Sequence, residues 1–136
     1  MEKKDKILIV DDEKDILSSL RRVFINEDFE AFFVCTYKEA MKVLNTKPIK
    51  VVMSDQRMPD VTGIDLLKEV KDKFPNIVRI LFTGYAQTHL INEAFDVAGV
   101  YKFISKPWST EQLKETVYEA IDEYNVLARA EKNKDE

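Results

Sequence analysis

The run Ile7-Leu8-Ile9-Val10-Asp11-Asp12 joins four consecutive apolar residues to two carboxylates. Later stretches repeat this arrangement, an apolar run followed by a polar or charged residue: Val51-Val52-Met53-Ser54-Asp55, Ile80-Leu81-Phe82-Thr83-Gly84 and Phe103-Ile104-Ser105-Lys106-Pro107. Short apolar runs of this kind are typical of buried parallel strands. The carboxyl ends of parallel strands meet at one edge of a sheet, where open α/β sheets bind ligands. The runs therefore predict a crevice lined by three carboxylates, a hydroxyl and an ammonium group.

Segments with a helical spacing of apolar residues separate these runs. Helices are predicted over 13–25, 37–44, 64–70 and 89–97 and after residue 109, and a further strand over 31–34. Thr36 and Ser109 are the predicted N-caps of the second and last helices. A strand–helix unit repeated five times favours an α/β fold, with a five-stranded, doubly wound parallel sheet and helices on both faces.

Length and charge limit the classes of function. A chain of 136 residues with a net charge of -4 fits one domain, and its mixed charges argue against direct binding of nucleic acid. The single cysteine, Cys35, excludes an intramolecular disulfide and fits a cytoplasmic location. We expect no membrane span and no signal peptide, because the apolar runs are too short for either.

The three aspartates at the predicted strand ends favour a metal site. Asp11 or Asp12 could instead cap the following helix, and Asp55 could be a turn residue before Met58-Pro59. Clustered carboxylates repel one another, however, and a divalent cation with oxygen ligands removes that repulsion. The predicted cofactor is Mg²⁺, for which Mn²⁺ could substitute, rather than zinc, because these segments contain no histidine or cysteine.

Lys106 and Thr83 are candidate ligands of a phosphoryl group. Beside a metal–carboxylate cluster, a lysine supplies a point charge for phosphate, and a threonine hydroxyl can donate to a phosphoryl oxygen. The alternatives are a surface lysine and a threonine that merely caps a helix. We expect the Lys106–Pro107 peptide bond to be cis, an arrangement that would direct the lysine into the crevice.

Taken in order, these residues resemble the receiver domain of two-component response regulators. The resemblance runs from about Lys6 to Tyr124 and rests on five motifs: Lys6-Ile7-Leu8-Ile9-Val10-Asp11-Asp12-Glu13, Val52-Met53-Ser54-Asp55-Gln56-Arg57-Met58-Pro59, Gly63, Leu81-Phe82-Thr83-Gly84 and Lys106-Pro107-Trp108. It implies a flavodoxin-like (βα)5 fold with strand order 2-1-3-4-5. It also implies a signalling switch whose only chemistry is self-catalysed phosphotransfer and autodephosphorylation, rather than an enzyme.

The resemblance implies a role for each site residue. Asp55 would accept a phosphoryl group from a histidine kinase. Asp12, Asp11 through water, Asp55 and the backbone carbonyl of Arg57 would hold Mg²⁺. Thr83 and Lys106 would bind the phosphoryl oxygens, a division of labour that suits phosphoryl transfer.

Further positions relate to the conformational switch and to the lifetime of the aspartyl phosphate. Phe103 stands where the family has an aromatic residue that takes part in switching. Because phenylalanine lacks a hydroxyl, a switch that couples Thr83 to Phe103 would use burial of the Phe103 ring. Plain core packing of Phe103 is the alternative. Arg57 and Tyr85 occupy positions that tune hydrolysis of the aspartyl phosphate in the family.

The predicted domain covers residues 5–125, followed by a helical extension or tail over 126–136. Apolar residues of the last helix alternate steps of four and three, a spacing that fits simple packing or a partner helix: Leu113, Val117, Ala120, Tyr124 and Leu127. The implied partners are a sensor histidine kinase or phosphotransfer protein, an output domain or effector, and a second copy of the chain after phosphorylation.

Three other functions fit less well. A dehalogenase-type phosphatase would need an aspartate two residues after the nucleophile, where Arg57 stands. A flavodoxin-like cofactor binder would need a phosphate loop where Asp11-Asp12-Glu13 stand, and those acids repel phosphate. A degenerate, phosphate-independent receiver is disfavoured by the intact acids and Lys106.

Overall fold

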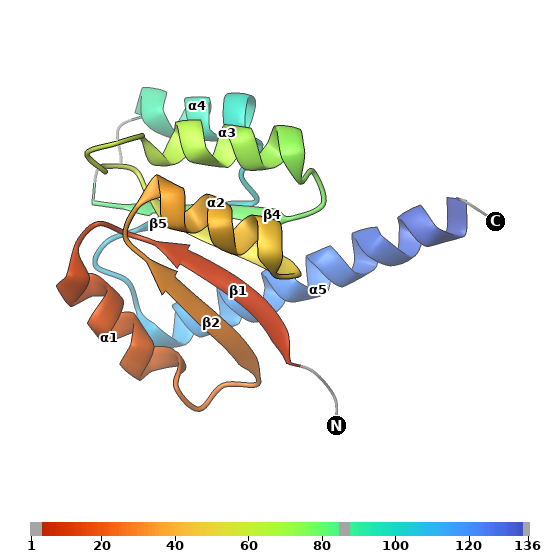
Figure 1. Cartoon of the computed structure of the whole chain (residues 1–136), viewed down its shortest axis with the longest axis horizontal. Helices are drawn as coiled ribbons and strands as arrows, with labels where there is room; N and C mark the ends of the chain where they lie inside the picture. Colours follow the sequence, from red (N-terminus) through yellow and green to blue (C-terminus); the bar gives the residue numbers. More distant parts are fainter. Residues whose placement is uncertain (1–3, 85–87, 135–136) are drawn as a thin grey trace.

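A five-stranded parallel sheet forms the centre of the computed structural model, which describes residues 4–84 and 88–134. The strands are β1 (Asp5–Val10), β2 (Phe29–Val34), β3 (Ile49–Asp55), β4 (Val78–Thr83) and β5 (Lys102–Ser105). They alternate with α1 (Lys14–Phe24), α2 (Tyr37–Thr46), α3 (Gly63–Lys73), α4 (Thr88–Ala98) and α5 (Thr110–Lys134). All neighbours pair in parallel in the order β2-β1-β3-β4-β5, which confirms the predicted fold (Figure 1).

The helices cover both faces of the sheet and bury two separate cores. Helices α2, α3 and α4 lie on one face, and α1 and α5 lie on the other (Figure 1). The residues of β1 alternate between the two cores: Leu8 and Val10 face the first, and Ile7 and Ile9 face the second. All four are fully buried, as expected of a central parallel strand with helices on both sides.

Several boundaries differ from the sequence prediction. β2 begins at Phe29, two residues before the predicted start, because Asp5 and Lys6 of β1 pair with Phe29 and Glu30. Helix α2 continues to Thr46, past the predicted end at Leu44. The predicted caps are present: the hydroxyl of Thr36 accepts from the Glu39 amide at 3.1 Å, and that of Ser109 accepts from the Gln112 amide at 3.4 Å.

Helix α5 continues without a break past the predicted domain boundary at residue 125. Val126 and Leu127 are exposed on this extension, 59% and 44% respectively. The Asn76 side chain, in the loop between α3 and β4, donates to Glu131 Oε2 at 2.7 Å. Figure 1 shows the extension projecting past the sheet. Across the described ranges, no helix combines the length and hydrophobicity needed to span a membrane.

Candidate functional site

The aspartates predicted from strand ends lie together at the carboxyl edge of the sheet. Asp11 and Asp12 directly follow β1, and Asp55 is the last residue of β3. One carboxylate oxygen from each lies within 4.8 Å of the others. Asp11 and Asp55 are buried and Asp12 is exposed. Asp11 Oδ1 accepts from the Glu13 amide at 2.9 Å, but the N-cap of α1 is Glu13, so Asp11 does not cap that helix.

Lys106 brings a positive charge into this cluster. Its ammonium nitrogen lies 3.1 Å from Asp11 Oδ2 and 3.5 Å from Asp55 Oδ1, and its side chain is only 16% exposed. The Lys106–Pro107 peptide bond is cis, as predicted. The same nitrogen lies 5.0 Å from the centre of the Phe82 ring, whose edge-on neighbour is Trp108. One ammonium therefore faces two buried carboxylates.

The electrostatics of Asp55 reflect this crowding. Burial raises the pKa of the Asp55 carboxyl above its ordinary value, and the Asp11 carboxylate adds to the rise. The Lys106 ammonium and a hydrogen bond from the Gln56 amide oppose it. The effects that raise the pKa of Asp55 outweigh those that lower it, so the pKa lies above its ordinary value. Additional positive charge near Asp55 would lower the pKa and favour the ionised carboxylate.

Thr83 and Phe103 lie on the two adjacent strands β4 and β5. Thr83 ends β4, is 1% exposed, and its carbonyl accepts from the Lys106 amide at 3.0 Å. Phe103 pairs in register with Leu81 and packs, partly buried, against the core beneath α2, α3 and α4. The two residues predicted to act as a switch thus occupy neighbouring strands, with Thr83 beside the crevice and Phe103 two positions back from it.

Sequence reasoning missed the contacts that shape the loop after Asp55. The Gln56 carbonyl accepts from the Gly63 amide at 3.0 Å, and Gln56 Oε1 accepts from the Ile64 amide at 2.9 Å. A Cβ at Gly63 would lie 2.2 Å from the Asp55 carbonyl oxygen, so only glycine permits this approach. Gly63 was part of the resemblance, but nothing in the sequence indicated that Gln56 closes the loop.

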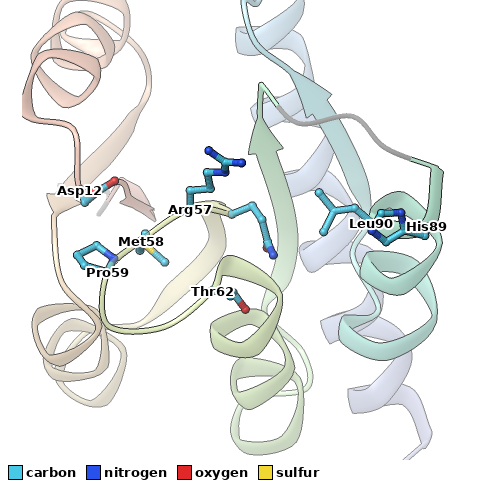
Figure 2. Close-up of a pocket in the computed structure, with 8 residues that line it drawn as sticks. Asp12, Arg57, Met58, Pro59, Thr62, His89 and Leu90 are labelled. Atoms are coloured by element: carbon cyan, nitrogen blue, oxygen red, sulfur yellow. The ribbon is translucent and has the colours of Figure 1, made fainter.

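An open cleft of about 490 Å³ lies beside the acid cluster (Figure 2). Asp12 lines it from the turn after β1, His89 and Leu90 from the start of α4, and the loop after Asp55 supplies the rest: Gln56, Arg57, Met58, Pro59 and Thr62. Arg57 and His89 are exposed. Tyr85, the second position expected to tune lifetime, lies outside the described residues.

The donor set fits a hard divalent cation. The three aspartates offer carboxylate oxygens within one short radius, two of them on buried side chains. Mg²⁺ binds through one or two carboxylates and keeps several waters, and the exposed Asp12 beside an open cleft leaves room for them. The cluster contains neither histidine nor cysteine, the ligands that would favour zinc.

The sequence is similar to that of signalling proteins. The family model of the response regulator receiver domain matches residues 7–118. The hydrogenase transcriptional regulatory protein HoxA of Cupriavidus necator is 39% identical over 121 residues, an alignment covering 89% of this chain and 25% of that protein. Sporulation initiation phosphotransferase F of Bacillus subtilis is 29% identical, with 83% of this chain and 90% of that protein covered. The chain spans about a quarter of the length of the HoxA relatives.

Solved structures share the fold. The signal receiver domain of an HD domain-containing protein from Pseudomonas fluorescens superposes with a TM-score of 0.90 at 25% identity, covering 95% of both chains. The beryllofluoride-activated NtrC4 receiver domain dimer gives a TM-score of 0.82 at 32% identity, covering 88% of this chain and 98% of that one.

Proposed function

We propose that this chain, which belongs to the response regulator receiver domain family, is a phosphorylation switch in which Asp55 accepts the phosphoryl group. The hydrogen bonds distinguish Asp55 from Asp11. Both carboxylate oxygens of Asp11 accept, from the Glu13 amide and from Lys106, whereas the Gln56 amide and the Lys106 ammonium both contact Oδ1 of Asp55. The buried Asp55 carboxylate lies at the end of β3, 3.5 Å from the Lys106 ammonium and within the cluster that Asp11 and Asp12 complete. A nucleophile, a balancing cation and metal-binding groups are thus in contact.

In the proposed reaction, a carboxylate oxygen of Asp55 attacks phosphorus in line with the leaving group. The new O–P bond forms as the P–N bond of a phosphohistidine on the donor protein breaks, and the leaving imidazole keeps that electron pair. Lys106 and the Thr83 hydroxyl bind the phosphoryl oxygens. Asp11, Asp12, Asp55 and the Arg57 carbonyl would hold Mg²⁺ or Mn²⁺, which when bound neutralises charge on the transferring group.

Labelling by a small phosphodonor tests this assignment. Acetyl phosphate with Mg²⁺ should add one phosphoryl group, seen by intact-mass spectrometry, and Asp55→Asn should abolish the addition. Asp15→Asn is the matched control, since it removes an equal charge from the exposed first turn of α1. Labelling that survives Asp55→Asn, or its absence from the wild-type protein, would refute the assignment.

The proposed output is a change in the surface formed by α4, β5 and α5. Phosphorylation would draw the Thr83 hydroxyl toward the new phosphoryl oxygens, and the Phe103 ring would bury itself in the space left behind. Beryllofluoride should therefore shift NMR signals of α4 and β5, and Thr83→Ala should suppress those shifts while retaining Asp55. Shifts of unchanged size in Thr83→Ala would contradict the coupling.

The proposed partners follow from the family and from the longer relatives. A sensor histidine kinase or phosphotransfer protein would donate the phosphoryl group in the cytoplasm, and an output domain or effector would read the changed surface. We assign residues 5–125 to the receiver and 126–136 to a helical extension or tail. A phosphorylation-dependent dimer through this extension is testable by light scattering with and without beryllofluoride.

A further inference from the structure

The loop between β3 and α3, residues 56–62, is tied to helix α2 by one side chain. Asp60 Oδ2 accepts a hydrogen bond from the Tyr37 amide at 2.8 Å. Tyr37 is the first residue of α2, so this amide has no partner within its own helix. A carboxylate at that position gains from both the hydrogen bond and the positive end of the helix dipole.

The other end of the same loop is fixed independently. The Gln56 carbonyl accepts a hydrogen bond from the Gly63 amide, and the Gln56 side chain accepts one from the Ile64 amide. Asp60 therefore supplies a second hydrogen-bonded anchor, beside the packing of Met58 and Val61 on the core, and the stretch from Arg57 to Pro59 lies between the two hydrogen-bonded anchors. That stretch lines the cleft beside Asp12 (Figure 2).

Helix α2 is a firm base for this anchor. Ala40 and Leu44 bury its inner face in the core. The Tyr37 hydroxyl bonds Glu69 of α3, which also pairs with Lys73 at 2.8 Å. A group held by the start of α2 is thus held relative to the whole face of the sheet that α2 and α3 cover.

We propose that Asp60 is a positioning residue for the metal site. By holding the loop between its two anchors, it fixes the place of the Arg57 carbonyl relative to Asp12 and Asp55. This inference rests on the proposed function, in which that carbonyl completes the Mg²⁺ ligands. Groups that orient metal ligands typically change affinity by about 10-fold or more when removed, so Asp60→Ala should weaken Mg²⁺ binding by roughly 10-fold.

Calorimetric titration with Mg²⁺ alone, on the full chain, tests the proposal. Thr36→Ala is the matched control, because Thr36 caps the same helix and its hydroxyl bonds to Glu39 of α2 rather than to Asp60. Both variants should lower the melting temperature by a few degrees, whereas only Asp60→Ala should weaken Mg²⁺. Asp60→Asn keeps an acceptor at the same place and should retain most of the wild-type affinity.

The outcomes separate this proposal from the proposed function. Wild-type Mg²⁺ affinity in Asp60→Ala would overturn the positioning role and leave phosphorylation of Asp55 standing. Equal weakening in Asp60→Ala and Thr36→Ala would also overturn it, because stability of α2 would then explain the effect. A wild-type protein with neither Mg²⁺ binding nor Mg²⁺-dependent labelling would overturn both.

Discussion

Lys106 and Arg79 are partly buried cations at opposite ends of the sheet, and their surroundings differ. Lys106 follows β5 at the carboxyl edge and faces the carboxylates of Asp11 and Asp55. Arg79 lies near the amino end of β4, and the guanidinium donates to four backbone carbonyls, those of Pro75, Ile77, Ala98 and Gly99. Gly99, at φ +58, brings the chain close to it, since a Cβ there would lie 3.2 Å from Arg79 Nη2.

Under the proposed function, this difference separates a cation that would act in phosphoryl transfer, Lys106, from one that stabilises the fold, Arg79. The carbonyls around Arg79 are neutral dipoles, and the guanidinium joins those at the end of α4 to those of the loop before β4 through hydrogen bonds. The cluster around Lys106 carries three carboxylates against one ammonium, which leaves negative charge for a second cation. Partial burial of a charge therefore does not by itself indicate a functional site.

Replacing Lys106 should give the largest effect. Lys106→Met should slow phosphorylation by roughly 10²–10³-fold, the usual cost of removing one preorganised group that stabilises developing charge. It should also tighten Mg²⁺ binding, because the competing ammonium is gone. Labelling rates and calorimetry check both, with Lys102→Met of β5 as the control. An unchanged labelling rate in Lys106→Met would contradict the distinction between Lys106 and Arg79.

Replacing Arg79 should instead affect folding. Arg79→Met should destabilise the protein by about 1–3 kcal/mol, because partly buried carbonyls lose their donor. Denaturant unfolding measures this loss, which should be the same with and without Mg²⁺. The folded variant should label at the wild-type rate. A loss of labelling that exceeds the unfolded fraction would place Arg79 in the switch rather than in the scaffold.

Asp55 provides a smaller, pH-dependent test of charge crowding at the carboxyl edge. Burial raises its pKa above the ordinary value of 3.8, so the folded state holds this proton to higher pH than the unfolded chain does. Ionisation then costs stability as pH rises through that window. Without metal, Asp55→Asn should melt above the wild type at neutral pH, and the difference should vanish in acid. A lower melting temperature for the variant at neutral pH would contradict this reasoning.

The smallest effect is expected at Lys50, another cation of the amino edge. Its ammonium lies 2.6 Å from Asp5 Oδ1 and 2.8 Å from Asn125 Oδ1, and it is 25% exposed. Lys50→Met should cost about 0.2–1 kcal/mol, typical of solvent-accessible pairs. Urea unfolding measures the cost, and labelling should be unaffected. Slower labelling would show that the two edges of the sheet are coupled.

The parts of the fold predictable from sequence were those repeated along the chain. The buried runs at 7–10 and 51–53 indicated central strands, and the ends of those runs indicated where the acids would meet. Strand order came from the family resemblance, because spacing alone leaves several doubly wound orders open.

The remaining contacts could not be predicted, because they join loops whose path depends on tertiary packing. Asp60 reaches Tyr37 across 23 positions, and Gln56 closes onto Ile64 across 8. No periodicity encodes such pairs. Arg79 did carry a signal, since a charge inside the run Val78-Arg79-Ile80-Leu81 must find partners when the strand is buried.

Mechanically, the extension of α5 makes that helix a lever arm. Its 25 residues give an axis of about 37 Å. The part beyond Asn125 accounts for about 13 Å, so a tilt of about 10° at Asn125 would displace its end by about 2 Å. The Asn76–Glu131 hydrogen bond restrains that arm, and a tilt that carries Glu131 away from Asn76 has to stretch or release it. A small change in the angle of α5 at the sheet would thus produce a larger displacement at the end of the helix.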